Sequence, residues 1–159
     1  MPNWVYNTLL VRGTPEHVAT VVGRLEGPEL TWGKDIPAPE ISPLTFSTLI
    51  APTPKERTQT YNDYGYDWQR AQWGTKWDAC RPIREWEPGA SVARYTFETA
   101  WREPWVWLNK LAEVFPTVRI DLWAVEEASH FVRRYRLRTG EAERIDLADG
   151  AWRTYLSTR

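Results

Sequence analysis

The chain has 159 residues, a net charge of −1, one cysteine and 11 tryptophans. The length fits a single domain, and the balance of 20 basic and 21 acidic residues argues against a basic duplex-DNA binder and against an acidic mimic of DNA. A single cysteine excludes an internal disulfide framework and suits a reducing compartment. Because no apolar run reaches the roughly 20 residues of a membrane span, we expect a cytoplasmic protein.

The first half of the chain opens with a predicted strand over residues 4–12, which are rich in Val, Leu and aromatic residues. Thr14 as N-cap and Pro15 in the first turn predict a helix, with an apolar face of Val18, Val21, Val22 and Leu25. A loop rich in Pro and Gly follows. Residues 44–50 are a candidate short strand, and residues 61–73 form either a short helix or an ordered loop.

The second half predicts two strands, a helix and a hairpin. Residues 78–86 and 91–99 are the strands, and in the second one Ala93, Tyr95 and Phe97 alternate with Arg94, Thr96 and Glu98. Pro104 opens a helix whose predicted apolar face is Trp105, Leu108, Leu111, Ala112 and Phe115. Residues 117–126 and 130–138 form the hairpin, and the tail adds a further strand or turn around Trp152 and Tyr155.

This order of elements predicts an α+β fold, a ferredoxin-like sandwich with one antiparallel sheet and two helices on one face. We expect one domain over residues 1–159. It contains a long aromatic-rich insertion at about 51–77 and a C-terminal extension at about 141–159.

Several motifs resemble the YubB ferredoxin-like domain family of phages and plasmids. They are Met1-Pro2-Asn3-Trp4 with Asn7, Phe46 followed by Ile50-Ala51-Pro52-Thr53-Pro54, Trp73-Gly74-Thr75-Lys76-Trp77-Asp78-Ala79, Phe97 with Thr99-Ala100-Trp101 and Pro104, and Phe115-Pro116. Val5 and Glu103 depart from the family pattern. The resemblance implies the ferredoxin-like fold and an accessory protein of a mobile element, and it implies no activity, cofactor or catalytic residue.

Two of these motifs supply the candidate binding residues: the central motif at residues 73–79 and the motif at residues 97–104. The candidates are Trp73, Lys76, Trp77, Asp78, Thr99 and Trp101. On an extended segment Lys76 and Asp78 would point the same way and orient a polar ligand group beside an indole wall. The alternative is a structural ion pair between the two, roofed by indoles. Both interpretations stay open at this stage.

A stripe of arginines on the predicted hairpin offers a second candidate surface. Arg134, Arg136 and Arg138 share one face with Trp123, which lies within reach of a cation–π contact. The pattern suits single-stranded nucleic acid or nucleotide binding on the sheet. The alternative is a solvated face neutralised by Asp121, Glu126 and Glu98.

Enzymatic motifs do not emerge from the sequence. Gly74-Thr75-Lys76 lacks the spacing of a phosphate-binding loop, and His17, His130 and Cys80 have no metal-ligand spacing. We expect Cys80 to be a small, buried or half-buried thiol. The sequence thus favours a non-enzymatic protein without a metal or cofactor that binds a host protein or a small ligand. Counter-defence is one version of that role, and a homodimer stays open.

Overall fold

The structure, a computed structural model, describes residues 2–128, 130–138 and 140–146. Its main sheet has six strands in the order β4-β5-β1-β6-β7-β8, and each neighbouring pair is antiparallel. The strands are β1 (Trp4–Arg12), β4 (Cys80–Glu85), β5 (Val92–Ala100), β6 (Arg119–Glu126), β7 (Val132–Arg138) and β8 (Glu141–Asp146). The predicted α+β ferredoxin-like sandwich is confirmed, because β4-β5-β1-β6 is its four-stranded core.

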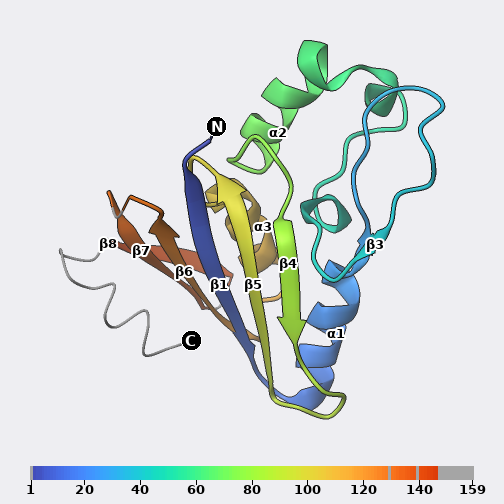
Figure 1. The fold of residues 1–159 in the computed structure, drawn as a ribbon. Helices are drawn as coiled ribbons and strands as arrows, with labels where there is room; N and C mark the ends of the chain where they lie inside the picture. The colour runs from blue at the N-terminus through green and yellow to red at the C-terminus, as the bar shows by residue number, and fades with distance from the viewer. Residues whose placement is uncertain (1, 129, 139, 147–159) are drawn as a thin grey trace.

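Helices α1 (Pro15–Leu25) and α3 (Trp105–Val114) lie on the same side of the sheet (Figure 1). The Thr14 hydroxyl caps α1 by accepting a hydrogen bond from the His17 amide at 3.3 Å, as the sequence predicts. The four predicted apolar residues of α1 are buried against the sheet: Val18, Val21, Val22 and Leu25.

The predicted apolar face of α3 is wrong at its start. Trp105 is 40% exposed, whereas Trp107 is fully buried. Trp105 occupies the first helical position and packs against Gly74, where an added Cβ would lie 2.9 Å from the indole Cδ1. The sequence pattern favoured Trp105 because its spacing to Leu108 fits a helix face, but Trp107 and Leu111 share a face equally well.

The candidate strand at 44–50 is also wrong, because Phe46–Thr48 forms a short 3-10 helix. The Phe46 amide and the Thr45 hydroxyl both donate to the Asp78 carboxylate, at 2.8 and 2.6 Å, and so are not available to a sheet. Near this segment, β2 (Gly27–Pro28) pairs with β3 (Ile41–Ser42) in a separate two-stranded sheet.

For residues 61–73 the helical alternative holds. A π-helical turn at Tyr61–Gly65 continues into α2 (Tyr66–Gln72), which lies beyond the end of the sheet where β1 begins (Figure 1). This segment and the loop between β2 and β3 place aromatic side chains around the motif at residues 73–79.

The hairpin register confirms the predicted faces of β6 and β7. Trp123 pairs with Arg134 and Asp121 with Arg136, while Leu122 and Tyr135 pair on the face toward the helices. Phe131 lies just before β7 rather than within it. The tail adds β8 next to β7, before the residues where we expected a further strand or turn; Trp152 and Tyr155 lie outside the described residues.

Candidate functional site

Two of the six predicted binding residues belong to the core. Trp73 is fully buried against Phe46 and Trp68, and its indole N–H donates to the Ile50 carbonyl at 2.9 Å. Thr99 is also fully buried, and its hydroxyl accepts a hydrogen bond from the Asn7 amide at 2.9 Å. Neither side chain presents a surface to a partner, so neither can contact one directly.

Three other predicted residues come together at one end of the sheet. The Lys76 ammonium lies 4.2 Å from the centroid of the Trp77 ring and 3.9 Å from that of Trp101. Each contact of this kind stabilises by about 0.5–2 kcal/mol, depending on how dry it is. Trp101 is nevertheless 49% exposed, so much of its ring surface stays open.

The backbone at Trp101 has a left-handed conformation, with φ of 70°. Such a φ is uncommon for a bulky residue other than glycine and persists only where the surroundings impose it. Here the Trp101 amide donates to the Asn3 carbonyl at 2.8 Å, and the Ala100 carbonyl accepts from the buried Thr75 hydroxyl at 3.1 Å. The central motif thus helps to hold Trp101 in an exposed position.

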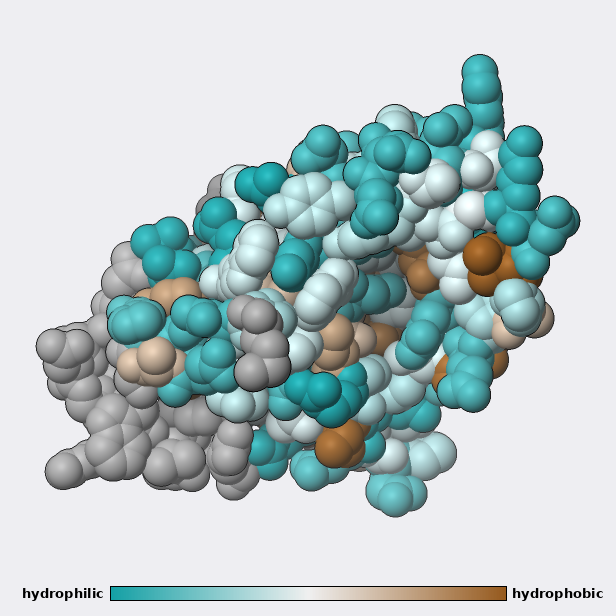
Figure 2. Space-filling model, turned by 45° about the horizontal axis from the view of Figure 1, so that its top comes forward, coloured by the Kyte–Doolittle hydropathy of each residue, from teal (hydrophilic) through white to brown (hydrophobic). Residues whose placement is uncertain are grey.

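Two residues that the sequence did not single out extend this cluster. The Trp4 ring lies 5.8 Å from Trp77, and the Arg81 guanidinium lies 4.8 Å from the Trp4 centroid. Arg81 also pairs with Glu98. We call Trp4, Lys76, Trp77, Arg81 and Trp101 the indole patch. The side of the molecule drawn in Figure 2 shows strongly hydrophobic residues only as small, separate areas among hydrophilic ones.

The Asp78 carboxylate does not pair with the Lys76 ammonium. Its carboxylate accepts three hydrogen bonds, from the Thr45 hydroxyl and from the Phe46 and Ala79 amides. The ion pairs among the described residues do not include Lys76 with Asp78, so the predicted shared orientation and the alternative ion pair are both wrong. The segment is not extended there, because Gly74 turns the chain with φ of +86°.

Burial raises the pKa of Asp78 from 3.8 to about 6, and nearby Glu29 adds to this rise. The three hydrogen bonds act in the opposite direction and offset part of it. The carboxylate therefore titrates close to neutrality.

On another side of the motif, Trp77 and Asp78 line a hollow of about 290 Å³. Its remaining lining residues are Leu30, Trp32, Tyr61 and Gln69. The loop before β3 and the π-helical turn bring these together from distant parts of the chain. The sequence shows the aromatic residues but gives no signal that they converge.

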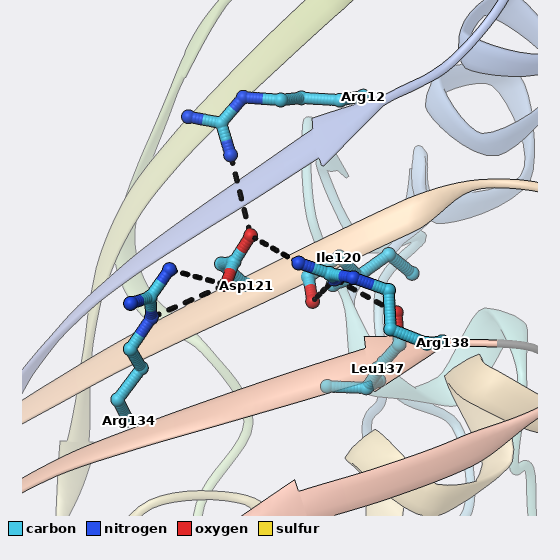
Figure 3. A network of polar contacts seen from close by, with 6 residues as sticks. All are labelled: Arg12, Ile120, Asp121, Arg134, Leu137 and Arg138. Atoms are coloured by element: carbon cyan, nitrogen blue, oxygen red, sulfur yellow. Dashed lines mark hydrogen bonds and ion pairs between the residues drawn. The ribbon is translucent and has the colours of Figure 1, made fainter.

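Two arginines of the stripe, Arg134 and Arg138, surround one buried carboxylate together with Arg12 of β1 (Figure 3). Asp121, 2% exposed, accepts from Arg134 at 2.9 Å, from Arg12 at 3.2 Å and from Arg138 at 3.3 Å. The Arg134 guanidinium also lies 5.0 Å from the Trp123 centroid, which confirms the predicted cation–π contact. Trp123 is only 5% exposed, so its ring is not a platform on which a base can stack.

The remaining polar clusters are structural in character. Glu103 is fully buried and accepts from Arg133 at 3.0 Å and from the Tyr135 hydroxyl at 2.5 Å. Cys80 is a half-buried thiol, as predicted; it donates to the Asp78 carbonyl at 3.4 Å, and burial raises its pKa. Within residues 2–128, 130–138 and 140–146, acidic, His and Cys side chains do not gather into a metal-binding group, and no helix is long and apolar enough to cross a bilayer.

Comparison with known proteins agrees with this fold. A model for the "Ferredoxin-like domain in Api92-like protein" matches residues 66–157. The crystal structure of the protein api92 from Yersinia pseudotuberculosis superposes with a TM-score of 0.70 at 9% identity, over 94% of this chain and 99% of that one. No curated protein matches the sequence. The chain belongs to the family of ferredoxin-like domains found in Api92-like proteins.

Proposed function

We propose that this chain is a non-enzymatic binding protein of a phage or plasmid, as its resemblance to YubB proteins implies, and that it contacts a host protein through the indole patch. Interference with a host defence is one version of this role. The observation that carries the proposal is Trp101, a half-exposed indole held in a left-handed backbone conformation against Lys76.

The chemistry of the indole patch favours a protein partner. Tryptophan and arginine are enriched at the energetic centres of protein interfaces, and tryptophan supplies a large contact area with little loss of side-chain freedom. Lys76 and Arg81 add positive charge over the rings of Trp101 and Trp4. The complementary surface is therefore one in which carboxylates border an apolar pocket for an indole.

Affinity capture from host cell extract tests this function. Trp101→Ala removes an anchor that is worth about 2 kcal/mol or more at a typical interface centre, which corresponds to about a 30-fold loss of affinity. Ile41→Ala is the matched control, because Ile41 is an exposed apolar residue on β3, outside the indole patch. A partner retained equally by both variants would contradict the proposal.

A second candidate function is single-stranded nucleic acid or nucleotide binding on the sheet face. Asp121 compensates only one of the three guanidinium charges that it contacts, and Arg136 faces it across the β6–β7 pair. Because Trp123 is buried, this interaction would rest on phosphate contacts and would weaken steeply with salt. A filter-binding assay with single-stranded oligonucleotides at two salt concentrations, using Arg136→Gln, tests it.

A further inference from the structure

The hollow beside the central motif has an aromatic wall and a partly buried acid. Trp32, Tyr61 and Trp77 supply three rings, Leu30 adds an aliphatic surface, and Asp78 contributes its carboxyl group. The volume of about 290 Å³ lies near the lower limit of roughly 300 Å³ for small-molecule pockets. Only Trp77 is shared with the indole patch, so this site can be examined separately from it.

The polar groups that line this pocket are already bonded within the protein. The Trp32 indole N–H donates to the Gln69 side-chain carbonyl at 2.7 Å, and the Gln69 amide donates in turn to the Lys76 carbonyl. The Tyr61 hydroxyl donates to that same carbonyl at 2.9 Å. Asp78 already has its three donors. A ligand that needs strong hydrogen bonds, such as a sugar or an amide, finds few groups left to meet it.

What the pocket still offers is aromatic surface and negative charge. The faces of Trp and Tyr rings attract cations through their quadrupoles, and Trp77 already holds the ammonium of Lys76 at 4.2 Å. Asp78 supplies a carboxylate, and Glu29 lies close enough to act on it electrostatically. Asp78 and Glu29 thus place negative charge in the same region as the Lys76 ammonium.

We propose that this pocket binds a quaternary ammonium group, with Trp32, Tyr61 and Trp77 around its methyl groups and Asp78 as the counter-charge. A trimethylated nitrogen carries a positive charge and an apolar surface but no N–H donor, and this combination matches the pocket. A primary ammonium or a guanidinium brings N–H donors that a ring face satisfies less well than water does, whereas a trimethylated nitrogen has no donor to leave unpaired. The group could belong to a free small molecule such as choline or to a trimethylated lysine side chain.

The test compares charged and neutral ligands of the same shape on the unaltered protein. Choline and dimethylbutanol, its neutral isostere with carbon in place of the charged nitrogen, are titrated while tryptophan fluorescence and heat are recorded. We expect choline to bind about tenfold or more tightly than dimethylbutanol, since a cation–π and ion contact of about 1.4 kcal/mol gives that ratio. Equal affinities, or no saturable binding of choline, would overturn the proposal without recourse to any variant.

Variants then locate the site. Asp78→Asn keeps a similar shape but removes the charge, and Trp32→Leu removes one ring; each is expected to weaken choline binding by about tenfold. Trp101→Leu is the control, because it alters the indole patch and leaves the pocket intact, which also separates this proposal from the proposed function. Unchanged choline affinity in a folded Asp78→Asn variant would overturn the assignment.

Two further titrations identify the source of the group. A peptide with trimethyl-lysine is compared with choline and with the same peptide carrying unmodified lysine. Tighter binding of the methylated peptide than of choline assigns the site to a modified protein, and the reverse assigns it to a free small molecule. Binding of the unmodified peptide as tight as that of the methylated one would contradict the proposed chemistry.

Discussion

Asp78 makes stability depend on pH in a direction opposite to that of most carboxylates. Its pKa rises from 3.8 to about 6 in the folded protein, because burial disfavours the ionised form. An acid whose pKa is raised by folding binds its proton more tightly in the native state. The contribution of Asp78 to stability is therefore greatest below about pH 4 and is lost as the pH rises from there through 6.

The magnitude follows from the two pKa values. At about 1.36 kcal/mol for each pKa unit, the ionised Asp78 lowers the free energy of unfolding by about 3 kcal/mol relative to the protonated form. Asp78→Asn cannot ionise, yet its amide oxygen can accept from the Phe46 and Ala79 amides and its N–H can donate to the Thr45 hydroxyl. We therefore expect the variant to equal the wild type near pH 4 and to exceed it by about 3 kcal/mol above pH 7.

Urea denaturation of both proteins across this pH range measures the difference, and subtraction removes the contribution of every other titrating group. Asp78→Ala is the control, because it leaves three donors without an acceptor and should be destabilised at every pH. A difference between wild type and Asp78→Asn that does not change with pH would refute the burial argument.

Three further substitutions test the packing around the site. Glu103→Ala removes the buried carboxylate that accepts from Arg133 and Tyr135 and should lower the free energy of unfolding by about 3–5 kcal/mol in urea denaturation. Gly74→Ala meets the Trp105 ring at 2.9 Å, whereas Gly89→Ala has a similar positive φ and open space; the first should lose about 1–3 kcal/mol more than the second. Asp121→Asn should cost roughly 1–3 kcal/mol, with a larger loss at low salt, because three guanidinium groups then repel one another.

Each of these three also has a result that would count against it. A Glu103→Ala variant as stable as the wild type would show that the buried carboxylate is not needed to hold Arg133 and Tyr135. Equal melting temperatures for the two glycine variants would mean that the Trp105 contact is easily relieved. A loss at Asp121 that is insensitive to salt would argue against repulsion among the arginines.

Local sequence patterns predict most of the regular helices and strands of this fold. Thr14 and Pro15 start α1 through cap chemistry that depends on neighbouring residues alone. The alternation in β5 follows from period-two burial, and the pairing of β6 with β7 follows from the alternation of residue types along the two strands. These predictions held because the interactions behind them are local.

The errors lie where a distant group overrides a local pattern. Residues 44–50 have strand-like composition. The Phe46 amide, however, donates a hydrogen bond to the Asp78 carboxylate, which lies more than 30 residues away in sequence. The spacing of Trp105 fits the apolar face of a helix. In the structure Trp105 packs against Gly74 outside the core, and Trp107 is the buried tryptophan of α3. Local propensity carries no information about such contacts.

The binding residues were predicted in part for the same reason. Lys76, Trp77 and Trp101 converge, and their residue types alone marked them as unusual. Trp73 and Thr99 are equally conspicuous in the sequence but pack inward. Trp4 begins β1, where alternating burial could have indicated its face, whereas Trp32 lies in an irregular loop and Tyr61 in a short π-helical turn.

The most direct test of the indole patch is a comparison of partner capture by the wild type, Trp101→Ala and Ile41→Ala at matched thermal stability. The proposed function predicts a protein that wild type and Ile41→Ala retain and that Trp101→Ala loses. Retention of the same protein by all three, with Trp101→Ala fully folded, would place the interaction elsewhere on the molecule.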